Sequence, residues 1–326
     1  MRVLAGDVGG TNARLAVVSV DAWHADIVLE RKYPSHDYPG LAPIVSRFCA
    51  EAGETPDRAC FGIAGPIVGD ECRTPNLPWV IRARELAAAT GVPRTRLIND
   101  FDAVGHGLPL MQGPDLMTLQ AGEAVAHGSI ALLGAGTGLG QGYLTWDGDR
   151  YRVHSSEGGH ADFAARTDIE SDLGRWLHEQ YGHASWERVI SGPGLVNVDR
   201  FLAQAGTAPE SDAVRDEMAR DASAAVVTRH GLDGSDALCV KALDMFVGCF
   251  GAQAGNVAVS VLATGGMYLA GGIAPRIAKL LASDLFLSAF RSKGRLSPVL
   301  AKVPVHIIVN PNVGLLGAAV AAAAQR

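Results

Sequence analysis

The segment Gly6-Asp7-Val8-Gly9-Gly10-Thr11-Asn12-Ala13-Arg14 places a glycine-rich turn between two apolar runs. The first run is Val3-Leu4-Ala5 and the second is Leu15-Ala16-Val17-Val18. This order predicts a β-hairpin whose turn carries no bulky side chain. The amides of such a turn can point into one concavity and bind phosphate oxygens, and a threonine hydroxyl adds a donor. The segment therefore predicts a phosphate-binding hairpin.

A second glycine-rich turn, Gly134-Ala135-Gly136-Thr137-Gly138-Leu139-Gly140, lies between the run 130–133 and a run beginning at Tyr143. An ordinary hairpin explains either turn alone, but together they indicate a nucleotide whose phosphates are held by two halves of one molecule. A side chain at Gly138 is expected to enter space reserved for phosphate oxygens. Residues 134–143 contain no G-x-G-x-x-G and the chain contains no Gly-Lys pair, so neither a Rossmann site nor a P-loop is expected.

The composition predicts a globular chain of two domains, because it has 326 residues of which 48% are hydrophobic and 19% charged. A net charge of −6 argues against broad binding to nucleic acid or anionic membranes. The five cysteines form no C-x-x-C pair, so a thiolate zinc site is not expected and a reducing cytoplasm fits. No signal-peptide apolar region precedes Asp7 and no apolar tract reaches the ~20 residues of a membrane span, so no membrane segment is expected.

The order of predicted elements divides the chain into two domains. Strand-like and helix-like runs alternate over the first hundred residues, which is typical of a sheet covered by helices. Residues 109–122 are expected to cross between domains, and three strand-like runs then precede a mainly helical stretch from Asp168 to Ala263. The final strand, loop and helix, 305–324, are expected to return to the first domain. The predicted domains are therefore 1–110 plus 305–326, a small α/β domain, and 111–304, a large domain.

Two polar clusters follow predicted strands, where ligand sites of open α/β sheets collect. Asn99 and Asp100 come directly after an apolar pair, although Asp100 could instead cap the helix that follows. In the second cluster, two glycines between Glu157 and His160 let the backbone bend and turn both side chains toward one ligand. Glu187 lies early in an expected helix, where interaction with the helix dipole is the alternative role.

These side chains suit a polyhydroxyl ligand, because carboxylates accept hydrogen bonds strongly while Asn and His side chains both donate and accept. Beside two phosphate turns, the same set predicts a sugar kinase. The chain also resembles the bacterial glucokinase family in blocks that occur in the family's order. The blocks are Gly6–Arg14, Gly62-Ile-Ala-Gly-Pro66, Ile98-Asn-Asp-Phe101, Gly134–Gly140, Glu157-Gly-Gly-His-Ala-Asp-Phe163, Ser191-Gly-Pro-Gly-Leu-Val-Asn197 and Ala270-Gly-Gly-Ile-Ala-Pro275.

The resemblance implies a two-domain actin-like ATPase (ribonuclease-H-like) fold, with a small α/β domain, a larger α+β domain and a cleft between them. It implies ATP and Mg²⁺ as cofactors, no direct metal ligand, Asp7 orienting a magnesium-bound water, and a homodimer. Asp100 takes the role of general base. The sugar contacts are Asn99, Asp100, Glu157, His160 and Glu187. The nucleotide contacts are Gly6, Asp7, Val8, Gly9, Gly10 and Thr11 in the first turn, Gly136, Thr137 and Gly138 in the second, and Gly271 and Gly272 at the adenosine.

The expected activity is ATP-dependent phosphorylation of D-glucose to D-glucose 6-phosphate. Related sugar kinases of the ROK (repressor, open reading frame, kinase) group carry a cysteine-rich zinc motif after the E-x-G-H. Residues 161–235 of this chain contain no cysteine. The chain is therefore expected to belong with the zinc-free glucokinases. A kinase for another hexose or a hexosamine remains the alternative. A sugar-responsive regulator would need an added DNA-binding segment, yet Asp7 already lies in the phosphate turn. A fold relative that hydrolyses ATP to move a partner does not explain the sugar cluster.

Overall fold

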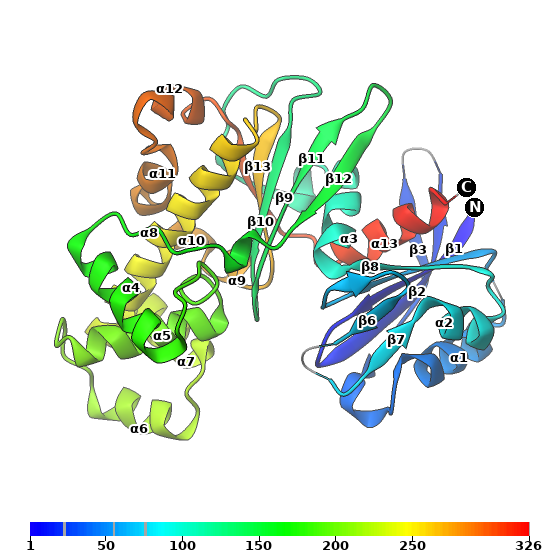
Figure 1. Cartoon of the computed structure of the whole chain (residues 1–326), viewed down its shortest axis with the longest axis horizontal. Helices are drawn as coiled ribbons and strands as arrows, with labels where there is room; N and C mark the ends of the chain where they lie inside the picture. Colours follow the sequence, from blue (N-terminus) through cyan, green and yellow to red (C-terminus); the bar gives the residue numbers. More distant parts are fainter. Residues whose placement is uncertain (22–23, 55, 75–76, 326) are drawn as a thin grey trace. The chain divides into compact units, whose positions relative to one another are not determined.

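The computed structural model describes residues 1–21, 24–54, 56–74 and 77–325. The chain forms two compact units (Figure 1). The first consists of Met1–Asp115, Asp149–Ser155 and Asn310–Arg326, and the second of Leu116–Gly148 and Ser156–Val309. Each unit is built on its own mixed β-sheet.

The first unit contains a five-stranded sheet of order β3-β2-β1-β4-β8. Its strands are β1 (Arg2–Val8), β2 (Asn12–Val20), β3 (Ala25–Pro34), β4 (Arg58–Ile63) and β8 (Arg94–Asn99). The strands β1, β2 and β3 pair antiparallel, while β4 and β8 continue parallel from β1. The first predicted hairpin is confirmed, since Val8 of β1 pairs with Ala13 of β2 and residues 9–11 form the turn.

Helices cover this sheet, among them α3 (Asp100–Gly107), which follows β8 directly. The helices α1 (Leu41–Ala52) and α2 (Ala83–Thr90) pack through Phe48 and Leu86 on a core that contains Leu4. The last helix, α13 (Val313–Ala323), contacts α3, β1 and β4. A Cβ atom at Gly317 would lie 1.7 Å from the Ala103 carbonyl oxygen, so α3 and α13 cross in direct backbone contact. A small sheet of β5 (Ile67–Val68), β6 (Glu71–Arg73) and β7 (Val80–Arg82) completes the unit.

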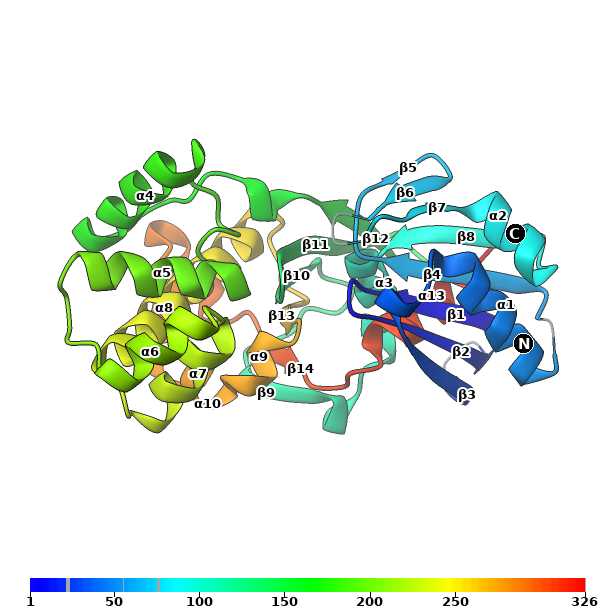
Figure 2. The same cartoon turned by 90° about the horizontal axis from the view of Figure 1, so that it is seen from below.

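A six-stranded sheet of order β12-β11-β10-β13-β14-β9 is built mainly from strands of the second unit, although the first unit includes β12 as far as Ser155 (Figure 2). Its strands are β9 (Leu116–Gln120), β10 (Ile130–Ala135), β11 (Leu139–Trp146), β12 (Tyr151–Ser156), β13 (Gly266–Ala270) and β14 (Val305–Ile308). The second predicted hairpin is confirmed, because β10 and β11 pair antiparallel up to Ala135 and Leu139, around the turn 136–138.

Residues 109–122 span the division between the units, since the first segment of the first unit ends at Asp115 and the second unit begins at Leu116 with the strand β9. The expectation for the final strand is wrong, because β14 pairs with β13 and β9 in the second sheet instead of returning to the first unit. Only the helix of the predicted 305–324 unit packs on β1 and β4, so the division between the units falls at residue 310 and not at 305. A short apolar strand can join either sheet, and the partners of β14 are far away in sequence.

Helices fill the rest of the second unit. They are α4 (Asp168–Tyr181), α5 (Gly192–Gln204), α6 (Asp212–Arg220), α7 (Ala224–Asp233), α8 (Ala237–Ser260), α9 (Ile273–Arg276), α10 (Ala278–Leu281), α11 (Asp284–Arg291) and α12 (Ser297–Leu300). The helix α8 contacts α5, α7 and α11, with Phe250 edge-on to Phe286. By length and composition α8 could cross a membrane, but 67% of its most apolar window is buried inside the protein, as in the core helix of a globular domain.

Candidate active site

Asn99 and Asp100 lie at the junction of β8 and α3 in the first unit. The Asn99 Oδ1 atom accepts a hydrogen bond from the Phe101 amide at 2.8 Å, and its Nδ2 atom donates to the Gly65 carbonyl at 3.1 Å. Asp100 Oδ1 accepts from the same Phe101 amide at 2.9 Å. Since Asn99 is the N-cap of α3 and its amide is fixed on both sides, helix capping does not depend on Asp100 alone.

The carboxyl group of Asp100 is held in an environment that favours its neutral form. Burial, and after it the negative charge of Asp7, raise the pKa of Asp100 to about 6. Burial also raises the pKa of Asp7, while Arg14, at 3.9 Å, lowers it. A carboxyl group whose pKa lies this close to neutrality is suited to accept and release a proton.

The first glycine turn is fastened by residues that the sequence did not indicate. The Gly9 amide donates to the Asn12 carbonyl at 2.9 Å, and the Ser35 hydroxyl donates to the Gly9 carbonyl at 2.9 Å. The Ser35 amide also donates to the Thr11 carbonyl at 2.9 Å. Ser35 is completely buried. A buried serine at the end of a strand gives no local sequence signal of this role.

Three predicted sugar contacts gather in the second unit, around the loop of Glu157 and the short helix Gly158–His160. His160 lies between two carboxylates, with Nε2 3.9 Å from Glu157 Oε2 and Nδ1 3.9 Å from Glu187 Oε1. The sequence predicted a helix at Glu187, but this residue lies in the turn before α5. The helix-dipole role is therefore excluded.

Glu187 connects this loop to the second glycine turn. Its amide donates to the Gly159 carbonyl at 2.8 Å, and its Oε2 atom accepts from the Leu139 amide at 2.9 Å. A Cβ atom at Gly138 would lie 2.6 Å from Glu187 Oε2, whereas nothing lies within 4 Å of a Cβ at Gly136. The expectation that Gly138 borders phosphate space is thus wrong, because the Glu187 carboxylate fills that space.

The two glycines of the loop serve close packing. A Cβ atom at Gly158 would lie 2.2 Å from Gln141 Nε2, and one at Gly159 would lie 2.2 Å from the Leu139 carbonyl oxygen. Neither glycine is among the described residues with a positive φ. The predicted reason for the glycines, a sharp bend, is therefore replaced by the direct approach of the loop to β11. Gln141 itself was missed by the sequence analysis.

The predicted adenosine residues lie at the end of β13. Gly271 has a φ of +83°, and a Cβ atom there would lie 2.3 Å from the Ala135 carbonyl oxygen, at the base of the second turn. Gly272 has open space at its Cβ position. Across residues 1–21, 24–54, 56–74 and 77–325, no group of three or more His, Cys, Asp or Glu side chains is arranged to hold a metal ion.

Comparison with known proteins identifies the family. A model of the glucokinase family matches residues 4–325. The glucokinase of Nostoc sp. is 42% identical, with 98% of each chain covered. The crystal structure of glucokinase from an Antarctic psychrotroph is 31% identical, with a TM-score of 0.86 over 99% of each chain. The ROK-family glucokinase of Streptomyces griseus, at 20% identity and a TM-score of 0.65 over both full chains, shares the fold. The chain has the actin-like ATPase fold of these sugar kinases and belongs to the glucokinase family.

Proposed function

We propose that this glucokinase-family protein transfers the γ-phosphoryl group of ATP to the 6-hydroxyl group of glucose, with Asp100 as the general base. The observation that carries the base assignment is the carboxyl of Asp100, held at the end of β8 with a pKa of about 6. As the hydroxyl oxygen attacks phosphorus, its proton passes to Asp100. The bond from phosphorus to the bridging oxygen breaks, and ADP leaves.

We assign the sugar contacts to Asn99 and Asp100 in the first unit and to Glu157, His160 and Glu187 in the second. Asn99 keeps one amide hydrogen beyond the bond to Gly65 and can donate it to a hydroxyl group. Glu157 and Glu187 accept from sugar hydroxyls, and His160 contributes a ring nitrogen. The support is chemical: two carboxylates with an imidazole 3.9 Å from both offer strong acceptors beside a group that donates or accepts.

We assign the phosphates of ATP to the turn 6–11 and to residues 136–137 of the second turn, and the adenosine to Gly271 and Gly272. The support for the second turn is the open space at Gly136, whose amide bonds back to the Gly138 carbonyl at 2.9 Å. Open space beside backbone amides admits a bulky anion. Gly136 and the exposed Thr137, and not Gly138, are the proposed phosphate contacts.

Mg²⁺ fits the donors present in the first unit. This ion keeps several waters and binds through one or two carboxylates and the substrate phosphates. The Asp7 side chain is 36% exposed, and its charge acts on Asp100, so two carboxylates share one region. We propose that Asp7 holds Mg²⁺ through a water molecule; when bound, the ion neutralises charge that develops on the phosphates.

The remaining proposals concern the surroundings of the enzyme. We propose a cytoplasmic location, because all five cysteines are free thiols, as expected in a reducing compartment. We propose a homodimer from the resemblance to the bacterial glucokinase family. Light scattering coupled to gel filtration measures the mass in solution and would contradict the dimer if it gave 34.0 kDa.

A coupled assay of glucose 6-phosphate formation tests the proposed function. The expected result is turnover with glucose and ATP, and a lower kcat/KM with mannose, fructose or glucosamine. The assay is repeated with ADP and with polyphosphate in place of ATP to test other phosphoryl donors. A higher kcat/KM for another hexose or for the hexosamine would reassign the substrate, and the absence of any sugar phosphorylation would refute the proposal.

A further inference from the structure

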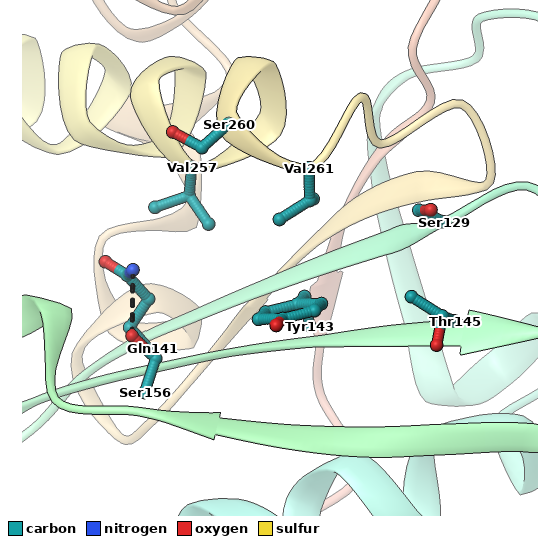
Figure 3. A pocket seen from close by; sticks show the side chains of 8 residues that line it. All are labelled: Ser129, Gln141, Tyr143, Thr145, Ser156, Val257, Ser260 and Val261. Atoms are coloured by element: carbon teal, nitrogen blue, oxygen red, sulfur yellow. Dashed lines mark hydrogen bonds between the residues drawn. The ribbon is translucent and has the colours of Figure 1, made fainter.

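A pocket of about 440 Å³ lies in the second unit between β11 and the C-terminal end of α8 (Figure 3). Its lining contains no charged side chain: it consists of Ser129, Gln141, Tyr143, Thr145, Ser156, Val257, Ser260 and Val261. Gln141 and Ser156 are hydrogen-bonded to each other at one end of the pocket. Because Ser156 directly precedes Glu157, this end of the pocket adjoins the sugar loop, residues 157–160.

A chain of four hydrogen bonds runs from α8 through this end of the pocket to the loop. Asn256 Nδ2 donates to Gln253 Oε1 at 3.1 Å, and Gln253 Nε2 donates to Gln141 Oε1 at 3.1 Å. Gln141 Nε2 then donates to Ser156 Oγ at 3.2 Å. The same hydroxyl oxygen accepts from the Gly158 amide at 3.1 Å. We call this chain the amide relay.

The relay connects a buried residue of a core helix to a loop with exposed side chains. Gln253 lies on the core helix α8 and is only 5% exposed. The side chains of Glu157 and His160 are 75% and 64% exposed, so packing does little to orient them. Their direction therefore depends on the loop backbone, which Glu187 holds at Gly159 and the relay holds at Gly158.

Gln141 has a second hold on the loop. A Cβ atom at Gly158 would lie within 2.2 to 2.7 Å of the Gln141 amide nitrogen, carbon and oxygen, so this amide packs directly on the loop backbone. Its nitrogen donates to Ser156 while its oxygen accepts from Gln253, which fixes its orientation at both ends. A side chain fixed in this way can transmit the position of α8 to the loop.

We propose that Gln141 is a positioning residue for glucose binding, which holds the sugar loop through Ser156 so that Glu157 and His160 face the substrate. This inference rests on the proposed glucose contacts. In this proposal Gln141 acts through Ser156 and Gly158 and not by contacting a substrate. Its loss allows the loop to adopt other directions, so glucose must select the productive one, which weakens the apparent affinity in proportion to its population.

The test compares Gln141→Met, which keeps the side-chain length but removes the amide, with Ser156→Ala, the double variant and Ser156→Thr. The expected rise in the glucose Kd by calorimetry is about three- to tenfold for either single variant, as for one neutral hydrogen bond. The KM for ATP should stay unchanged. The double variant should be no worse than the singles, and Ser156→Thr, which keeps the hydroxyl, should bind glucose like the wild type.

Ser260→Ala is the matched control, because Ser260 lines the same pocket and its hydroxyl donates to the Asn256 carbonyl of its own helix at 2.8 Å. An equal loss of glucose affinity in this control would assign the effect to pocket packing and overturn the proposal. Unchanged glucose Kd in Gln141→Met and Ser156→Ala, with Glu157→Gln still impaired, would overturn the relay and leave the proposed function standing. An unchanged glucose Kd in Glu157→Gln as well would refute the proposed glucose contacts and, with them, the role of the relay.

Discussion

Substitution of the second glycine turn separates two roles that its sequence cannot distinguish. Gly136→Ala and Gly138→Ala add the same methyl group two residues apart, and neither position has a positive φ. At Gly136 the methyl group enters open space, whereas at Gly138 it meets the Glu187 carboxylate at 2.6 Å. We therefore expect Gly136→Ala to affect ATP and Gly138→Ala to affect glucose.

The size of the Gly138→Ala effect follows from the contact. Glu187 Oε2 must retreat by about 0.8 Å to reach an ordinary distance of 3.4 Å, and we expect this movement to weaken or break its 2.9 Å bond to the Leu139 amide. A hydrogen bond to a charged group contributes about 1.5 to 3 kcal/mol, or about 10- to 150-fold in binding. Because the end of a flexible side chain moves, we expect about a tenfold rise in the glucose Kd and a small loss of stability.

Calorimetry with glucose alone and steady-state kinetics with varied ATP measure the two effects. Thermal unfolding of both variants, whose added volume is identical, controls for damage to the fold. Gly136→Ala should raise the KM for ATP and leave the glucose Kd within twofold of the wild type. A glucose Kd that is unchanged in folded Gly138→Ala would refute the role of Glu187 as a sugar contact held by the turn.

Three further predictions concern the carboxylates. Asp100→Asn should retain glucose binding in calorimetry and lower kcat by about 10²- to 10⁴-fold, and turnover within a few fold of the wild type would exclude Asp100 as the base. The base must be ionised, so kcat/KM should fall on acidification below about pH 6. In Asp7→Asn this fall should occur at lower pH, because the substitution removes a charge that raises the Asp100 pKa. An unchanged pH profile in Asp7→Asn would contradict the interaction between the two carboxyl groups. Glu157→Gln and Glu187→Gln should weaken glucose binding far more than ATP binding, which parallel titrations of both ligands would check.

Both hairpins could be predicted because their signals are local. A glycine turn between two apolar runs determines its own pairing, and β1–β2 and β10–β11 formed as expected. The place of β14 could not be predicted, since its partners Met267–Leu269 and Leu116–Gln120 are distant in sequence. Period-two hydrophobicity identifies a strand but not the sheet that accepts it.

The error at Glu187 had a local signal. The helix begins only at Gly192, where Ser191 is the N-cap whose hydroxyl accepts from the Gly194 amide at 2.9 Å, and proline occupies position 193. A serine followed by a proline in the first turn marks a helix start. Glu187 therefore precedes the helix, and its side chain is available to the turn and to the loop.

The connection between the two predicted sites is a property of the fold alone. Glu187 lies 48 residues from Leu139, yet one carboxylate accepts from the turn while its backbone holds Gly159 of the sugar loop. The glycine turn is thus one support of the sugar site as well as a candidate phosphate contact. Because one side chain serves both segments, a substitution in the turn can change glucose binding without touching glucose. A loss of activity in such a variant therefore identifies a nucleotide contact only when glucose binding, measured without ATP, is unchanged.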